Sequence, residues 1–236
     1  MKRHCPARVL PIRLTRSIIS TGEWAFHRDG TQSRTSIPDG VYTPIVMEKS
    51  LQQRIDEAVR EYISIVPYDL RWPDLFEAEA DFLRRTLPRR LVRRIEHFGS
   101  TAVPALAAKP IIDILIEVTG LQETQEQIVP ILTSRGYDYF WRTDVQPPYA
   151  WFIKRDSEQR RTHHLHFVEA DSALWERLLF RDYLRRFPEE ARRYAELKVS
   201  LANEFPNDRV AYAQGKTGFI VAVTEKAGRF FGKAVP

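Results

Sequence analysis

The amino-acid sequence predicts an α/β core followed by a helical C-terminal part that packs on it. Short apolar runs typical of strands alternate with segments of helical periodicity through the middle of the 236-residue chain, whereas the last third carries helical periodicity alone. The apolar share of 43% and the charged share of 28% are typical of a globular protein, and the length fits one domain or two small ones.

The first 47 residues lack a clear periodicity and are rich in Arg, Ser, Thr, Pro and Gly, so we expect a poorly ordered extension there. The first 22 residues hold no acidic side chain, as in an organellar transit peptide, although Met47 could equally mark the true start of the chain. Residues 48–232 show neither a repeat nor a linker. We therefore expect a single domain, with an α/β core at about 64–169 and a helical part at about 171–232.

The first half of this domain is expected to contain two helices and three strands. Apolar side chains at helical spacing predict the helices, short apolar runs predict the strands, and Pro73 suits the first turn of the second helix. The last of the three strands is almost continuously apolar, which indicates burial on both of its faces. In order, the elements are a helix at 49–62, a strand at 64–69, a helix from Pro73 to about Leu87, and strands at 91–98 and 110–118.

The second half is expected to continue with one helix and three strands before the chain becomes helical. Gly136 stops the helix, Asp171 or Ser172 can cap the first C-terminal helix, and Gly215 and Gly218 are weak points in the last one. In order, the elements are a helix at 121–134, strands at 137–142, 149–155 and 162–169, and helices from 171 or 172 to about Phe187, from Pro188 to about Phe205, and from about Asp208 to Phe231.

Composition and charge exclude several classes of protein. The single cysteine, Cys5, rules out a disulfide framework and a cysteine-based zinc site, and it suits a reducing compartment, so we expect a cytoplasmic protein. No apolar run approaches the ~20 residues that span a bilayer, so we expect no membrane partner. The net charge of +5 comes mostly from residues 1–50, which hold eight basic and four acidic residues. The remainder is nearly neutral, which argues against nucleic acid as a partner.

The stretch HFGSTAVPALAAKPIIDILIEV, at 97–118, combines a Gly-Ser-Thr turn with one aspartate inside an apolar strand. The backbone N–H groups and hydroxyls of a turn at Gly99, Ser100 and Thr101 suit a phosphate. Asp113, on the next strand, could hold a divalent cation such as Mg²⁺ or Mn²⁺ against that phosphate. The alternative is a structural role, in which a tight turn precedes a core strand and the aspartate only accepts hydrogen bonds from backbone N–H groups.

These residues resemble the signature of the GrpB family, which reads approximately as a Gly-Ser-Thr-Ala-Val-Pro turn, then Lys-Pro, then Ile-Asp. Here the three parts are residues 99–104, Lys109-Pro110 and Ile112-Asp113. The segments VPYDLRWPDLF, HHLHFV, FRDYLRRFPEEARRYAELK and YAQGKTGFI also match, so the resemblance extends over about residues 64–225. At Ala105 the family pattern has a glycine.

The resemblance implies a nucleotidyltransferase-like fold, which is a mixed sheet flanked by helices, and a metal-dependent nucleotidyltransferase activity without an organic cofactor. The implied ligand is a nucleotide or another phosphorylated small molecule. Similar domains occur fused to dephospho-CoA kinase, which also implies a protein partner. Dephospho-CoA kinase activity, however, needs a P-loop with the pattern G-x-x-x-x-G-K-S/T. Gly215-Lys216-Thr217 matches the end of this pattern, but Val210 takes the place of its first glycine, so we do not expect kinase activity.

Active members of the nucleotidyltransferase superfamily carry two carboxylates two residues apart on one strand. Here Leu115 takes the second position. His164 and His166 alternate onto one face of their strand, so they could complete a single metal site with Asp113, or His166 could act as a general base. His163 faces the other way and is interpreted as a structural residue.

Cationic side chains at the matched motifs are the candidates for binding phosphate, although each could instead be a solvated surface charge. They are Lys109, Arg161, Arg181, Lys198 and Lys216. Two alternatives to a transferase stay open. Leu115 favours a catalytically inactive nucleotide-binding module, and the kinase fusions favour a chaperone-like or regulatory partner of another enzyme.

Overall fold

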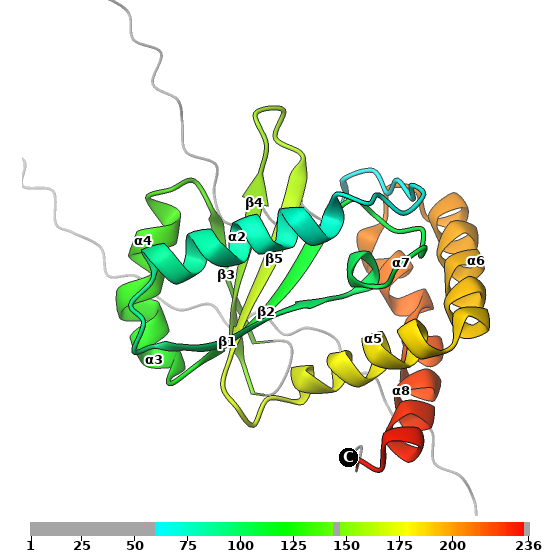
Figure 1. Cartoon of the computed structure of the whole chain (residues 1–236). Helices are drawn as coiled ribbons and strands as arrows, with labels where there is room; N and C mark the ends of the chain where they lie inside the picture. The colour runs from blue at the N-terminus through cyan, green and yellow to red at the C-terminus, as the bar shows by residue number, and fades with distance from the viewer. Residues whose placement is uncertain (1–59, 144–146, 234–236) are drawn as a thin grey trace, which may run out of the picture. The chain divides into compact units, whose positions relative to one another are not determined.

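The computed structural model describes residues 60–143 and 147–233. The predicted extension at 1–47 and nearly all of the predicted helix at 49–62 lie outside these residues. The described part contains a five-stranded sheet with the spatial order β1-β2-β5-β4-β3 (Figure 1). Its strands are β1 (Val92–Phe98), β2 (Ile112–Val118), β3 (Asp138–Arg142), β4 (Tyr149–Arg155) and β5 (Arg161–Val168).

The sheet is mixed. β2 runs parallel to β5, whereas β1 and β2, β5 and β4, and β4 and β3 are antiparallel pairs. A parallel pair needs a long crossover, and here the crossover contains a helical segment and the β3–β4 hairpin. The parallel register aligns Asp113 with His164 and Leu115 with His166. A mixed sheet flanked by helices confirms the predicted fold class.

Helix α2 (Trp72–Thr86) lies across one face of the sheet (Figure 1). Pro73 occupies its first turn, as expected. Its apolar positions recur every three or four residues and form one buried stripe against the strands. The stripe consists of Trp72, Phe76, Ala80 and Leu83. It packs in the largest hydrophobic cluster with Ile112, Ile114 and Ile116 of β2 and with Phe152 and Phe167 of the neighbouring strands.

Two predicted elements differ from the structure. The predicted strand at 64–69 is only an isolated bridge between Val66 and Ala108, because the segment meets the loop before β2 and not another strand. The predicted helix at 121–134 is divided into α3 (Leu121–Glu123), a π-helical turn (Thr124–Ile128) and α4 (Val129–Thr133). Pro130 lies within this segment and has no N–H, so it cannot donate a helical hydrogen bond.

The C-terminal part is helical, as predicted. It contains a 3₁₀ turn (Ala173–Trp175), α5 (Glu176–Arg186), α6 (Pro188–Glu204), α7 (Arg209–Gly215) and α8 (Thr217–Phe231). The predicted last helix is broken at Lys216, beside the expected weak point at Gly215, whereas Gly218 lies within the first turn of α8. A Cβ on Gly215 would lie 2.5 Å from Cδ2 of Leu201, so glycine lets α7 pack closely against α6.

Helices α5, α6 and α8 pack on the turn that follows β1. Val103 and Leu106 of the turn form a buried cluster with Phe180, Tyr194 and Val223, one from each of these helices. A separate cluster joins Leu115 of β2 to Leu178 of α5. The face of β2 that carries Asp113 and Leu115 is therefore the face toward the C-terminal helices.

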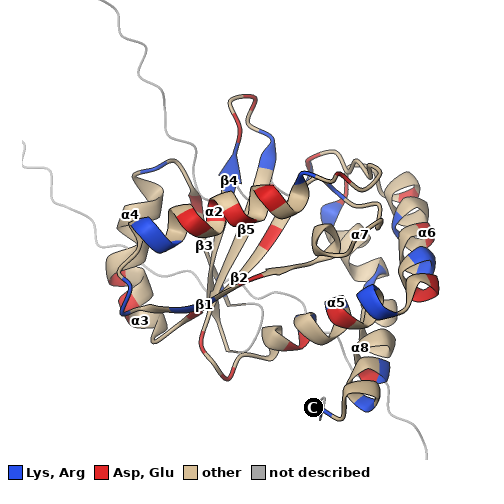
Figure 2. Cartoon of the chain, in the orientation of Figure 1, with Lys and Arg blue, Asp and Glu red and all other residues tan. Residues whose placement is uncertain are grey.

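Charges of both signs are interspersed along α6, whereas α2 carries acidic side chains along most of its length and basic ones at its C-terminal end (Figure 2). This mixture agrees with the nearly neutral balance of the domain, and the absence of a nucleic-acid partner stays a prediction. Among the helices of the described part, no helix combines the length and the apolar character needed to cross a bilayer.

Candidate functional site

Gly99 lies between β1 and a short 3₁₀ turn (Ser100–Ala102), with a φ of +73°. A Cβ at this position would lie 2.4 Å from Oδ2 of Asp113, well inside van der Waals contact. Both the backbone conformation and the close approach therefore require glycine. The Gly-Ser turn predicted from the sequence is thus held directly against the carboxylate of β2.

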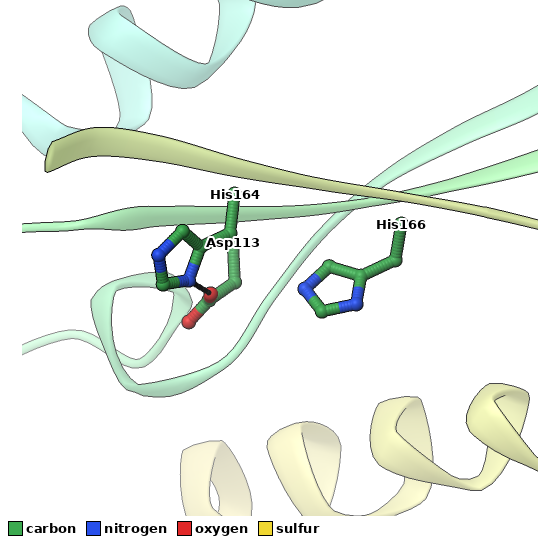
Figure 3. A group of neighbouring side chains, drawn as sticks. All are labelled: Asp113, His164 and His166. Atoms are coloured by element: carbon green, nitrogen blue, oxygen red, sulfur yellow. Dashed lines mark hydrogen bonds and ion pairs between the residues drawn. The ribbon is translucent and has the colours of Figure 1, made fainter. Parts of the chain in front are cut away.

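Asp113, His164 and His166 come together beside this turn (Figure 3). The Nδ1 of His164 lies 3.2 Å from Oδ1 of Asp113, at hydrogen-bond distance, and one ligand atom from each of the three side chains lies within 4.8 Å of the others. Neither ring nitrogen of His166 has a hydrogen-bond partner among the described residues, although both are buried. Such atoms are rare unless they have a functional partner.

Burial dominates the electrostatics of the three side chains. It lowers the pKa of His164 to about 4 and that of His166 to about 3, so both rings are neutral at pH 7. Burial alone would raise the pKa of Asp113, but the hydrogen bond from His164 and nearby positive charges hold this pKa below its usual value. One carboxylate and two neutral imidazoles are a donor set that fits a divalent transition metal.

The cluster opens into a pocket with a volume of about 360 Å³ between the sheet and the C-terminal helices. Among the described residues that line it, five carry a positive charge, and Asp113 is the only carboxylate. The cations are Lys109, Arg142, Arg177, Lys198 and Lys216. Such an excess of positive charge favours an anionic ligand.

Three lysines of the pocket are kept partly uncharged by their surroundings. Burial, followed by neighbouring cations, lowers the pKa of Lys109 and Lys198 to about 7 and that of Lys216 to about 8. The Nζ of Lys198 donates to the carbonyl of Ala107. The Nζ atoms of Lys109 and Lys216 lie 5.2 and 4.4 Å from the ring centre of Tyr212. A phosphorylated ligand would stabilise the charged form of all three lysines.

The pocket contains most of the residues predicted from the sequence, but their side chains have different tasks. Gly99, Ser100 and Thr101 all line it. The hydroxyl of Thr101 already donates to the carbonyl of Ile111 over 3.3 Å, so it ties the turn to the start of β2. Leu115 is fully buried in the cluster toward α5 and leaves no second carboxylate.

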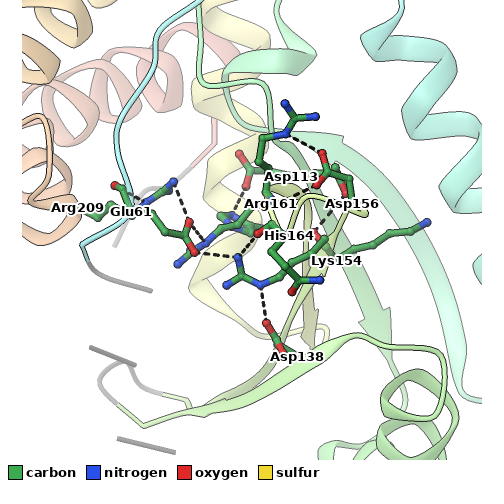
Figure 4. Close-up of polar contacts among 12 residues, drawn as sticks. Glu61, Asp113, Asp138, Lys154, Asp156, Arg161, His164 and Arg209 are labelled. Atoms are coloured by element: carbon green, nitrogen blue, oxygen red, sulfur yellow. Dashed lines mark hydrogen bonds and ion pairs between the residues drawn. The ribbon is translucent and has the colours of Figure 1, made fainter. Parts of the chain in front are cut away.

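Two predicted phosphate ligands, Arg161 and Arg181, are not among the residues that line this pocket. Arg161 is held by Glu61 at 2.7 Å, within an ion-pair network that also contains Arg155 and Arg209 (Figure 4). Its Nη1 lies 3.5 Å from Nε2 of His164, on the side of the ring away from Asp113. The structure therefore assigns Arg161 a supporting position behind the cluster.

Arg181 binds three groups away from the pocket. It contacts Glu96 at 2.9 Å, Asp182 at 2.7 Å and the carbonyl of His97 at 2.7 Å, and so joins α5 to β1. His163 is also separate from the cluster, because its side chain points to the opposite face of β5, where its Nδ1 lies 3.0 Å from the hydroxyl of Thr162.

No sequence motif indicated two cations of the pocket. Arg142 ends β3, at the far edge of the sheet, and Arg177 lies in the first turn of α5. Tyr149 and Tyr194 were also missed. A hydrogen bond with Ser100 lowers the pKa of Tyr194 slightly against the larger rise caused by burial, which links α6 to the glycine turn. Only the tertiary arrangement brings these residues to the turn.

Comparisons with known proteins agree with this description. The family model described as GrpB protein matches residues 62–226. A UPF0157 protein of Pseudomonas aeruginosa is 41% identical over 180 residues, which are 74% of this chain and 72% of that protein. The crystal structure of the conserved protein GrpB from Enterococcus faecalis superimposes with a TM-score of 0.64 at 31% identity, over 72% of this chain and 100% of that chain.

A dephospho-CoA kinase of Mycolicibacterium paratuberculosis is 32% identical over 124 residues, which are 50% of this chain and 28% of the kinase. This similarity concerns a minor part of that enzyme. The family model and the Pseudomonas relative, by contrast, each match well over half of the chain. The chain therefore belongs to the GrpB family.

Proposed function

We propose that the protein binds a nucleotide, or another phosphorylated ligand, together with a divalent metal ion held by Asp113, His164 and His166, and that it transfers a nucleotidyl group to an acceptor. The observation that carries this proposal is the position of the three side chains inside a pocket lined by five cations. A metal ligand set and a concentration of positive charge in one cavity both suit phosphate groups.

Each part of the pocket has a task in this proposal. Lys109, Lys198 and Lys216 contact phosphate oxygens and gain charge as they do so. The backbone of the Gly99 turn approaches the ligand closely because this residue has no side chain. The metal, when bound, neutralises phosphate charge as a Lewis acid. In the transfer, an acceptor oxygen attacks the α-phosphorus, the bond to the β-phosphate oxygen breaks, pyrophosphate leaves, and the acceptor proton passes to solvent.

A thermal-shift and calorimetric screen tests the binding step. We expect ATP, GTP, CTP or UTP to raise the melting temperature in the presence of Mg²⁺, Mn²⁺ or Zn²⁺, with about 2.7 kcal/mol of added stability at a hundredfold excess over Kd. Asp113→Asn, which keeps the size of the side chain, should abolish the part of the shift that depends on the metal. If neither a nucleotide nor inorganic triphosphate binds, the proposal is wrong.

Leu115 supports a second candidate function, which is ligand binding without catalysis. It fills the position of a second metal-binding carboxylate and is completely buried. Incubation with a nucleotide that is radioactively labelled at the α-phosphate separates the two candidates. A transferase releases pyrophosphate and moves the label to an acceptor from a cell extract, whereas a binding module retains the nucleotide unchanged. The similarity to a dephospho-CoA kinase supports a regulatory variant of that module, which would act on a partner enzyme.

A further inference from the structure

A second cleft, with a volume of about 750 Å³, lies beside the basic pocket. It runs between the start of α5, with its preceding 3₁₀ turn, and helices α7 and α8. The two cavities share four lining residues, which are Leu174, Arg177, Lys216 and Ile220. Because the shared residues border both spaces, the cleft adjoins the pocket.

The charges of the two spaces differ. The cations Arg177 and Lys216 stand where the pocket and the second cleft meet. Beyond this junction, Glu176 and Glu225 line only the second cleft. Neither carboxylate has an ion-pair partner within residues 60–143 and 147–233. A phosphate in the second cleft would face these carboxylates, so phosphate groups belong in the pocket and a phosphate-free group belongs in the cleft.

The remaining lining of the second cleft suits a hydrogen-bonding organic group. Gln214 and Thr217 offer amide and hydroxyl groups, and Ala173, Ala213 and Val221 offer small apolar surfaces. Clefts that hold organic ligands commonly measure ~300–1,000 Å³ and combine an apolar lining with a few polar groups. At about 360 Å³ the basic pocket is near the lower end of that range, and the adjoining second cleft offers about 750 Å³ more.

We propose that the second cleft binds the phosphate-free part of the ligand, a hydrogen-bonding group of about the size of a nucleoside, while its phosphates lie in the basic pocket. This inference rests on the proposed function, because it assumes an anionic ligand at Asp113. It deepens that proposal by defining the ligand as a large organic phosphate. Inorganic phosphates and small phosphate esters fill only the first space.

Calorimetric titrations with inorganic triphosphate and with ATP, GTP, CTP and UTP, all in the presence of Mn²⁺, test the inference. We expect at least one nucleotide to bind about tenfold more tightly than inorganic triphosphate. Val221→Trp and Ala213→Trp should remove this advantage, because both positions are exposed and line the second cleft but not the pocket. Both variants should still bind inorganic triphosphate within about twofold of the parent protein.

Val199→Trp is the matched control, since Val199 is an exposed valine on α6 that lines neither cavity. It should leave both affinities unchanged, and circular dichroism should verify that all variants are folded. If neither inorganic triphosphate nor any nucleotide binds, the proposed function itself has failed. If triphosphate binds but no nucleotide binds more tightly, or if the tryptophans in the second cleft leave the nucleotide affinity unchanged, this inference alone is wrong.

Discussion

The backbone of Gly99 lies against the carboxylate of Asp113 so closely that a Cβ would sit 2.4 Å from Oδ2. Gly99→Ala should therefore lower the affinity for inorganic triphosphate by at least about tenfold, because either the turn or the aspartate must move. Gly136→Ala is the control. Gly136 has a φ of +82°, but a Cβ added there would meet no atom within 4 Å. This substitution therefore carries only the energetic cost of placing alanine in a left-handed conformation. Equal affinities of the two variants would contradict a role for the close approach.

Metal binding should depend on the face of β5 from which a histidine projects. We expect His166→Gln to weaken Mn²⁺ and Zn²⁺ binding by about 10- to 100-fold, a typical cost of disturbing a metal site. His163→Gln, on the opposite face of the same strand, should change metal affinity little although it also alters a buried histidine. Competition with a fluorescent chelator measures both. Unaltered metal affinity in the His166 variant would remove this residue from the site.

The affinity of the pocket for anions should fall as the pH rises from 6.5 to 9. The pKa values of Lys109 and Lys198 are about 7 and that of Lys216 is about 8 in the free protein, and a bound anion raises them. Binding of inorganic triphosphate should therefore take up protons in this range. Calorimetry in buffers of different ionisation enthalpy detects this uptake, and binding without proton uptake would show that the lysines do not contact the anion.

The same lysines should make the free protein more stable as the pH rises from about 7 toward 10. Their pKa values are lower in the folded than in the unfolded state, so over this interval the unfolded chain binds more protons, and deprotonation favours folding. Chemical denaturation at several pH values measures the trend. Lys198→Met should flatten it, because this substitution removes a lysine that is only 2% exposed.

Substitutions of Arg161 and of Lys216 should affect different properties: the first should lower stability and the second should weaken triphosphate binding. Arg161→Met removes one of the three arginines that contact the half-buried Glu61, and it should lower the free energy of unfolding by about 1.5 kcal/mol, the scale of one hydrogen bond to a charged group. The affinity of its folded form for inorganic triphosphate should change by less than about threefold. Lys216→Met should instead weaken triphosphate binding by about tenfold and leave stability nearly unchanged. The reverse pattern would restore Arg161 as a phosphate ligand.

Ala105 stands where the family pattern has glycine, and its φ is +62°, in the left-handed region. An alanine in this region costs roughly 1–2 kcal/mol, whereas glycine adopts it freely at some cost in unfolded-state entropy. Ala105→Gly should therefore raise the free energy of unfolding, by about 0.5–1 kcal/mol, in a denaturant titration. A loss of stability would mean that the turn gains more from the methyl group than the backbone strain costs.

The sequence by itself determined the local structure and one half of the candidate site. Periodicity predicted α2, α5 and α6 and the strands of the sheet, because apolar spacing reflects burial directly. Gly99 and Asp113 were recognisable because they lie 14 positions apart on consecutive elements. Local sequence indicated weak points at Gly215 and Gly218 but could not place the break at Lys216 or the division of the helix around Pro130, because both depend on packing against other segments as well as on propensity.

Only the tertiary structure decided the other half of the site. The parallel register of β2 with β5 brings His164 beside Asp113 and His166 beside Leu115, although about fifty residues separate the two strands in the chain. The same packing brings Arg142 and Arg177 to the pocket and directs Arg161 and Arg181 into ion pairs with Glu61 and Glu96. Whether a cation faces a ligand or a carboxylate depends on which neighbours the fold supplies, and this information is not contained in the residue's own segment.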